Sequence, residues 1–313
     1  MGVSPTTAII LAAGEGKRLR SHVPKVLHVA AGRPLLVHVL TALAPMGFDE
    51  RLVVTAPGTE IEPVVTAAGF DGIKYAVQHP PRGTGDAVRV ALQEVETAGG
   101  DVLVICGDTP LLKTETLRNL VAAHKDRGAV ATMLIARTDS PAGEGRIIRG
   151  EDGDVDHIVE ERDATPAELA VDEINAGVYV FDEPALRELV GELRADNTQG
   201  EFYLTDVIGL IRGRRGLVAA MTADADEVAG VNSLKQLADV ARFLREQTRE
   251  RWMNEGVTIV DPDSTFIDVS VQLESDVIVQ PFTFLEGETE IAAGAEIGPQ
   301  ARIVDSQVGP KAR

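Results

Sequence analysis

The sequence predicts an α/β protein with a helix-covered parallel sheet and a β-rich insertion, followed by a linking helix and a short parallel β-helix. Three observations predict this. From residue 8 to about 136, apolar runs of strand length alternate with amphipathic stretches, the pattern of a parallel sheet buried on both faces. Between about 140 and 182, short strands alternate with glycine-rich turns. In the C-terminal tail, aliphatic residues recur at every sixth position.

The α/β part is assigned to residues 1–231. Such sheets bind ligands at the carboxyl ends of their strands, so residues that directly follow a strand are the first candidates for a site. The expected strands and helices alternate as 8–13, 35–44, 52–55, 60–68, 74–77, 84–95, 102–105, 114–125 and 130–135.

The next two segments are the β-rich insertion and a linking helix. Strands at 146–148, 155–159 and 174–181 are expected to form an inserted lobe that completes a cleft. A linker helix is assigned to residues 232–255, with Asn232 and Ser233 as candidate N-cap residues. Trp252 is expected to pack at the junction with the tail. The helical spacing is carried by Leu234, Leu237, Ala241, Leu244, Thr248 and Trp252.

The tail, residues 256–313, has a period that suits neither an α-helix nor a pleated strand. A period of six predicts a left-handed parallel β-helix with three flat faces, in which each rung points one aliphatic side chain inward. A chance run in a β-rich tail is the alternative, but Asp, Ser, Gly and Pro residues interrupt any longer strand. Because the sequence ends at Arg313, after little more than two coils, we expect a partial domain. The period is carried by Ile267, Leu273, Val279, Leu285, Ile291, Ile297 and Ile303.

Composition excludes several classes of protein. The formal net charge of -19 over 313 residues disfavours a nucleic-acid surface, because binding a phosphate backbone requires an excess of cations. The single cysteine, Cys106, excludes an internal disulfide and fits a reducing cytoplasm. It ends an apolar run and is interpreted as a packed strand residue rather than a nucleophile. No apolar stretch reaches the roughly 18 residues of a membrane helix, so we expect a cytoplasmic protein with no membrane partner.

A glycine-rich turn follows the first predicted strand, at residues 11–19 (LAAGEGKRL). Its backbone N–H groups suit an anion. Lys17 is followed by Arg18 rather than Ser or Thr, which excludes a Walker loop, and Leu19 replaces the third glycine of a dinucleotide fingerprint. Together with Pro24 and Lys25, the turn resembles the signature of sugar-phosphate nucleotidyltransferases.

The run PKVLH at 24–28 narrows the resemblance to the bacterial bifunctional N-acetylglucosamine-1-phosphate uridyltransferases and glucosamine-1-phosphate N-acetyltransferases. The resemblance covers essentially the whole chain. It implies a Rossmann-like nucleotidyltransferase domain followed by a left-handed β-helix. The family is trimeric, but here we expect weak or absent trimerisation and an incomplete acetyltransferase half. Further similar blocks follow in the family's order at 78, 83–85, 107–111, 145–147, 158–160, 175–177, 201–206 and 230–232.

The resemblance implies Mg²⁺-dependent transfer of a uridylyl group from UTP to N-acetylglucosamine 1-phosphate. The products would be UDP-N-acetylglucosamine, a cell-wall precursor, and pyrophosphate. Carried over by position, the implied roles are catalysis for Arg18 and Lys25; nucleotide binding for Leu11, Ala12, Ala13, Gly14, Gln78, Gly83 and Thr84; sugar binding for Gly145, Glu160 and Asn175; and metal binding for Asp108 and Asn232.

These residue types suit that reaction. An oxygen of the sugar phosphate attacks the α-phosphorus in line, so the difficulty is negative charge, which cations and metal ions offset. The purely structural alternatives to metal binding are a turn-capping role for Asp108 and an N-cap role for Asn232. The chain departs from the family at Arg82, Asp86 and Glu144. Arg82 and Asp86 either alter nucleotide affinity or pair with each other, and Glu144 alters the rim of the sugar site.

Three other functions remain open. A uridylyl- or thymidylyltransferase that uses another sugar 1-phosphate, such as glucose 1-phosphate, shares the glycine-rich loop. A non-catalytic sugar-nucleotide sensor is disfavoured because Arg18, Lys25, Asp108 and Asn232 are all retained. An acetyl-CoA-dependent acyltransferase is disfavoured because residues 257–313 carry no histidine.

Overall fold

The computed structural model describes residues 6–14, 16–96, 99–141 and 143–313. The chain forms two compact units that are interleaved in sequence. The first contains the chain up to Leu27 together with Leu36–Gly230, and the second contains His28–Leu35 and Val231–Arg313. Among the described residues, no helix is both long enough and apolar enough to span a bilayer.

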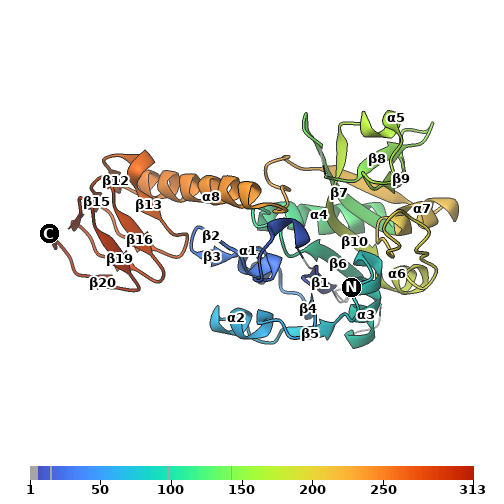
Figure 1. Ribbon diagram of the computed structural model, residues 1–313, viewed down its shortest axis with the longest axis horizontal. Coiled ribbons are helices and arrows are strands. Elements are labelled where there is room, and N and C mark those ends of the chain that lie inside the picture. The colour runs from blue at the N-terminus through green and yellow to red at the C-terminus, as the bar shows by residue number, and fades with distance from the viewer. Residues whose placement is uncertain (1–5, 15, 97–98, 142) are drawn as a thin grey trace. The chain divides into compact units, whose positions relative to one another are not determined.

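The first unit is built on a mixed sheet with the strand order β11-β7-β10-β6-β1-β4-β5 (Figure 1). Strand β1 is parallel to both β4 and β6, and β4 is parallel to β5, which confirms the predicted parallel core. The strands are β1 (Thr6–Leu11), β4 (Glu50–Thr55), β5 (Lys74–Val77), β6 (Asp101–Cys106), β7 (Ala131–Arg137), β10 (Glu173–Asp182) and β11 (Val218–Thr222).

Helices cover both faces of this sheet, as the alternation of the sequence predicts. Successive residues of a strand point to opposite faces, and Ile9 and Ile10 accordingly belong to different core clusters. The cluster of Ile9 includes side chains of α3 (Thr84–Glu94), α6 (Glu183–Leu189) and α7 (Asp206–Gly213). The cluster of Ile10 includes side chains of α1 (Leu35–Leu43), α2 (Ile61–Ala67) and α4 (Thr114–Arg127).

The inserted lobe is smaller than predicted. Strands β8 (Arg146–Arg149) and β9 (Val155–Val159) form an antiparallel hairpin, as expected. The third expected strand, 174–181, lies in β10, which pairs with β8 at Ile174 but otherwise runs antiparallel between β6 and β7 in the main sheet. The reason is burial: Val178, Val180 and Phe181 are fully buried, which requires covered faces on both sides. A short helix, α5 (Pro166–Leu169), follows β9.

The second unit contains the predicted linker helix, α8 (Leu234–Asn254). Its N-cap is Ser233, whose hydroxyl accepts a hydrogen bond of 3.2 Å from the backbone N–H of Gln236. Trp252, near its C-terminal end, is 4% exposed and packs in the core of the β-helix strands. The expected packing role of Trp252 is therefore observed.

The tail forms a short parallel β-helix, in agreement with the six-residue period. Its strands form three sheets, β12-β15-β18, β13-β16-β19 and β14-β17-β20. Residues 18 apart stack, so Ile267 pairs with Leu285 and Leu285 with Ile303. The strands are β12 (Thr258–Ile259), β13 (Phe266–Ile267), β14 (Gln272–Leu273), β15 (Ile278–Val279), β16 (Phe284–Glu286), β17 (Glu290–Ile291), β18 (Glu296–Ile297), β19 (Arg302–Val304) and β20 (Gln307–Val308).

A hairpin from the N-terminal part of the chain, β2 (Val29–Ala30) and β3 (Arg33–Pro34), completes the second unit. Its turn residue Gly32 has φ +85°, and a β-carbon there would lie 2.4 Å from Cγ of Asp268. The position therefore requires glycine. The backbone N–H of Val269 donates to the carbonyl of Ala31 at 3.1 Å, which attaches the hairpin to the first coil.

Four short 3-10 helices complete the secondary structure of the described residues: Lys17–Leu19, Lys25–Leu27, Ala44–Met46 and Pro262–Ser264.

Candidate functional site

A cation and a carboxylate meet where two central strands end. Strands β1 and β6 are adjacent and parallel, and Gly107, directly after β6, donates its N–H to the carbonyl of Leu11 at 2.9 Å. The next residue, Asp108, forms an ion pair with the ammonium group of Lys25, which lies in a 3-10 turn. Both side chains are largely buried, at 13% and 18% exposure. The carboxyl edge of the sheet thus holds the predicted Lys25 and Asp108 together.

Arg18 and Glu144 belong to the same cluster. The Arg18 guanidinium lies 3.6 Å from the point that a β-carbon on Gly143 would occupy. The pKa of Glu144 is raised to about 7, first by burial and then by the negative charges of Asp108 and Glu160, while Arg18 and Lys25 oppose the shift. Sequence analysis predicts only that Glu144 alters the rim of the sugar site, and it does not predict that this carboxyl group joins the cluster of Arg18, Lys25 and Asp108.

Cys106 lies next to this cluster at the end of β6. Burial, reinforced by the charge of Asp108, raises the pKa of its thiol to about 12. A thiol with this pKa is protonated near neutral pH and is a poor nucleophile. This agrees with the interpretation of Cys106 as a packed strand residue.

The glycine-rich turn begins at Leu11, the last residue of β1. The N–H of Ala12 is already donated to the carbonyl of Val54 at 2.9 Å, so this group continues the sheet rather than contacting an anion. A β-carbon on Gly14 would meet no atom within 4 Å, so the backbone at Gly14 borders open space. Glu15, within the predicted loop, lies outside the described residues.

Gln78 follows strand β5 and is 3% exposed. Its amide nitrogen donates to the carbonyl of Gly83 at 3.0 Å and to the carboxylate of Asp86 at 2.8 Å. Asp86 also forms an ion pair with Arg89. Of the two alternatives for Arg82 and Asp86, mutual pairing is therefore not what the structure has, because the described partners of Asp86 are Gln78 and Arg89.

Gly83 is placed by a close approach of two backbones. It has φ +102°, and a β-carbon there would lie 2.5 Å from the carbonyl oxygen of Phe202. The backbone N–H of Phe202 donates to the carbonyl of Arg82 at 2.7 Å, and Leu204 donates its N–H to the hydroxyl of Thr84 at 3.0 Å. The segment around Phe202 therefore holds the loop that contains Gly83 and Thr84.

The same segment reaches the predicted sugar-binding residues. The hydroxyl of Thr205 donates to the carboxylate of Glu160 at 3.0 Å. Burial raises the pKa of Glu160, the Thr205 hydrogen bond opposes this, and neighbouring carboxylates, Asp206 first, reinforce it. This contact of Thr205 was not predicted from the sequence, although Thr205 lies in one of the family-like blocks.

Asn175 and Gly145 lie side by side, because the N–H of Asn175 donates to the carbonyl of Gly145 at 2.9 Å. The side-chain oxygen of Asn175 accepts hydrogen bonds from the hydroxyl of Tyr179 at 2.8 Å and from the N–H of Gly177 at 3.2 Å. Because the side-chain oxygen of Asn175 already accepts two hydrogen bonds, the NH₂ group is the part of this amide that can still donate.

Asn232, the second predicted metal ligand, lies in the other unit, just before α8. Its backbone N–H donates to the side chain of Gln236 at 2.9 Å, and the cap itself is Ser233. The alternative role of Asn232 as the helix cap is therefore wrong.

The donor set can be tested against a magnesium ion. The described residues include no group of three or more His, Cys, Asp or Glu side chains that could hold a metal. Mg²⁺ needs no such group, since it is commonly held by one or two protein carboxylates, substrate phosphates and water. Asp108, a hard oxygen donor at the carboxyl edge of the sheet, fits this pattern.

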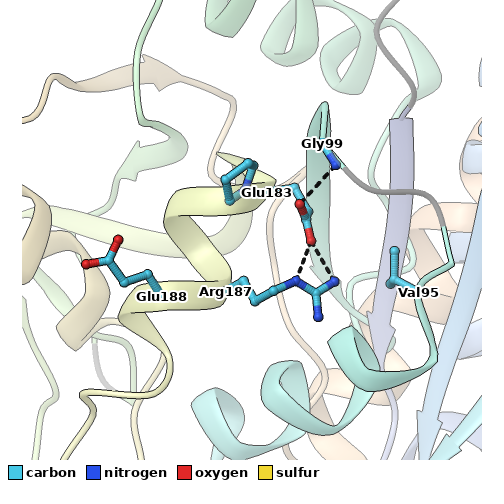
Figure 2. Close-up of a pocket in the computed structure, with 6 residues that line it drawn as sticks. Val95, Gly99, Glu183, Arg187 and Glu188 are labelled. Atoms are coloured by element: carbon cyan, nitrogen blue, oxygen red, sulfur yellow. Dashed lines mark hydrogen bonds and ion pairs between the residues drawn. The ribbon is translucent and has the colours of Figure 1, made fainter.

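A pocket at the opposite edge of the sheet is a poorer candidate (Figure 2). Gly99, which helps to line it, precedes β6, so the pocket lies at the amino end of that strand. Glu183 accepts hydrogen bonds from Gly99 N–H at 3.1 Å and from Arg187 Nε at 2.6 Å, which Figure 2 marks with dashed lines. Through these hydrogen bonds, the Glu183 carboxylate connects residues on the two sides of the pocket.

Comparisons with known proteins point to one family. Residues 8–202 match the model of the MobA-like NTP transferase domain. The fold is also similar to a structure from Bacillus anthracis provisionally named a glucose-1-phosphate thymidylyltransferase, in complex with a sucrose. That similarity has a TM-score of 0.61 at 21% identity and covers 76% of this chain and 94% of the other.

Three relatives bear the name bifunctional protein GlmU. The protein of Caldanaerobacter subterraneus subsp. tengcongensis is 44% identical over 96% of this chain, which covers 65% of the relative. That of Mycolicibacterium vanbaalenii is 47% identical over 96%, with 62% of it covered. That of Exiguobacterium sibiricum is 42% identical over 97%, with 68% of it covered. The chain thus spans about two thirds of the length of these curated relatives, and it belongs to the GlmU family, with residues 8–202 as its MobA-like NTP transferase domain.

Proposed function

We propose that this protein catalyses Mg²⁺-dependent transfer of a uridylyl group from UTP to N-acetylglucosamine 1-phosphate, releasing pyrophosphate. The observation that carries the proposal is the cluster of Lys25, Asp108 and Arg18 at the carboxyl edge of a parallel sheet. Membership of the GlmU family supports the reaction class.

The two cationic side chains, Lys25 and Arg18, would stabilise negative charge on the phosphates. Lys25 supplies a point charge for the α-phosphoryl oxygens, and the forked guanidinium of Arg18 suits the departing pyrophosphate. Mg²⁺, held by Asp108 and Asn232, would neutralise phosphate charge when bound. Since the thiol of Cys106 is protonated, we assign it no covalent role, and the sugar phosphate attacks directly.

The polar groups on either side of the cluster suit a uracil base and a neutral sugar. Gln78 and Gly83 lie on the loop after β5, where the imide edge of a base can meet an amide. Asn175 offers an NH₂ group and Glu160 a carboxylate for sugar hydroxyls and the acetamide. The product, UDP-N-acetylglucosamine, would serve cell-wall precursor synthesis in the cytoplasm.

A matrix of substrates tests the proposal. The purified protein is incubated with Mg²⁺, each nucleoside triphosphate in turn and a panel of sugar 1-phosphates, and pyrophosphate release is measured. We expect UTP with N-acetylglucosamine 1-phosphate to be the best pair and EDTA to abolish the signal. Preference for dTTP with glucose 1-phosphate would refute the assignment, and no release from any pair would favour a sugar-nucleotide sensor.

A further inference from the structure

The hydrogen-bond partners of Gln78 allow only one orientation of its side-chain amide. Two acceptors, the carbonyl oxygen of Gly83 and the carboxylate of Asp86, lie at 3.0 and 2.8 Å from its nitrogen. A flipped amide would put its oxygen against both, and each contact would become repulsive. Because a carboxylate cannot donate a hydrogen bond in its ionised form, Asp86 excludes the flip.

Asp86 is itself held in place. It is 5% exposed in the first turn of α3, where the helix dipole favours a negative charge, and it forms an ion pair with Arg89. The Arg89 guanidinium lies 5.4 Å from the centre of the Phe202 ring, a cation–π contact. Phe202 belongs to the segment that holds the loop of Gly83, so Asp86 is anchored from two sides.

The orientation decides which atom of Gln78 a ligand can meet. With both N–H groups of the amide engaged, the side-chain oxygen Oε1 is left for the ligand. Within the described part of the chain, no group donates a hydrogen bond to Oε1 of Gln78. If this oxygen were also fully buried, it would be a buried polar atom without a partner, and it is not one of those atoms. Oε1 therefore retains access to solvent.

A hydrogen-bond acceptor that faces the base, such as Oε1 of Gln78, distinguishes uracil and thymine from cytosine. Uracil and thymine carry a donor N–H at ring position 3, whereas cytosine carries an acceptor nitrogen there. An oxygen that cannot turn away accepts from the first two bases and opposes the third. The selectivity arises because two hydrogen-bond acceptors that face each other without a donor between them raise the free energy of the complex.

We propose that Asp86 is a positioning residue for base selection: it fixes the Gln78 amide with its oxygen toward the nucleotide, so that the protein accepts uracil or thymine and rejects cytosine. The inference rests on the proposed uridylyl transfer, which it deepens. It gives a role to a residue at which this chain departs from its family's pattern, and it acts through Gln78 rather than by touching the base.

The test measures the ratio of kcat/KM for UTP to that for CTP, by pyrophosphate release with N-acetylglucosamine 1-phosphate. Asp86→Asn keeps the shape but can accept or donate, so both orientations of Gln78 become available. Asp86→Ala leaves the Gly83 carbonyl alone to orient the amide. We expect the ratio to fall about 10- to 100-fold in Asp86→Ala, the range of a charge-assisted hydrogen bond, and by a smaller factor in Asp86→Asn.

Asp182→Asn is the matched control. It also removes a carboxylate from a helix N-terminus, but Asp182 accepts from the N–H of Ala185 in α6. The control should keep the wild-type ratio. The inference is overturned if the Asp86 variants keep that ratio, including the case in which UTP and CTP activity fall in equal proportion, as a purely structural role would require. Failure of the proposed function is seen separately, because wild-type protein alone would then release no pyrophosphate from UTP.

Discussion

Lys25 and Asp108 neutralise each other across two turns that follow neighbouring strands, with both side chains largely buried. Each partner is matched to a different part of the proposed substrate complex, since an ammonium group suits phosphate oxygens and a carboxylate suits Mg²⁺. The ion pair therefore holds both side chains in place, and the proposed nucleotide and its metal would replace this contact on binding.

Replacing Lys25 with Ala should lower kcat on the order of 10²-fold or more, with a smaller change in KM for UTP, if its charge acts on the transition state. Steady-state pyrophosphate release measures both constants. Lys113→Ala is the control, because Lys113 is an exposed lysine 3.6 Å from Glu227, and it should behave as wild type. A rise in KM alone would make Lys25 a ground-state anchor.

Asp108→Ala and Asn232→Ala should each lower kcat strongly while the circular dichroism spectrum stays native. If these residues hold Mg²⁺, activity should also require more metal, because one oxygen ligand is lost. The measurement is kcat as a function of Mg²⁺ concentration. Near-normal turnover of either variant at saturating Mg²⁺ removes that residue from the metal site.

Glu144 makes stability depend on pH in a defined direction. Its pKa is about 7 in the folded protein and 4.5 ordinarily. Between these values the folded state keeps a proton that the unfolded state has released, so the free energy of unfolding falls as pH rises from 4.5 to about 7 and then levels off. The loss amounts to about 3 kcal/mol at most.

Glu144→Gln should remove this contribution. The variant is expected to gain stability relative to wild type as pH rises from about 5 to about 8, measured by urea unfolding without metal or nucleotide. A difference between the two proteins that stays constant over this range would show that Glu144 titrates normally.

Glu160→Ala and Asn175→Ala should raise KM for the sugar phosphate and leave KM for UTP nearly unchanged. The reason is that their side chains bond to Thr205 and to Tyr179, and among the described residues no side-chain hydrogen bond joins either of them directly to Gln78, Gly83 or Thr84. Two-substrate kinetics separates the constants. Glu168→Gln, on the exposed helix α5, controls for general effects of removing a carboxylate. An equal rise for UTP would contradict the division between sugar and base residues.

Leu285→Ala should destabilise the second unit by about 2–5 kcal/mol, because Leu285 is fully buried in the β-helix core. Val304→Ala, at a side chain 42% exposed, should change stability by about 0.5 kcal/mol or less. Trp252, the chain's only tryptophan, packs in this core and reports its unfolding by fluorescence. Equal midpoints of denaturation for the two variants would argue against a packed coil.

Periodicity was sufficient for the elements that repeat. The spacing from Ile267 to Ile303 predicts the stacked rungs, because each inward side chain needs only its neighbours 18 residues away. The position of β10 was not predictable in this way, since an apolar run such as 174–181 fits an edge lobe and a central strand equally well. Its burial depends on β6 and β7, which are distant in sequence.

The residues of the candidate site also divide into those that local sequence predicts and those that depend on distant contacts. Lys25 and Asp108 could be named from local motifs and from their place after a strand. The roles of Glu144 and Asp86 could not, because a carboxylic acid becomes unusual only through its surroundings. Glu144 acquires its raised pKa from burial, and Asp86 acquires its role from an amide eight residues away.

The hairpin of Ala31 and Gly32 imposes an order on folding during synthesis. Its partners, Asp268 and Val269, are translated more than two hundred residues later. At the usual rate of about 5–20 residues per second, the hairpin waits on the order of tens of seconds before the first coil can dock on it. Strands β1 and β4, which flank the hairpin in sequence, can pair during that delay. During that delay the hairpin between these two strands lacks the contacts that Asp268 and Val269 later provide.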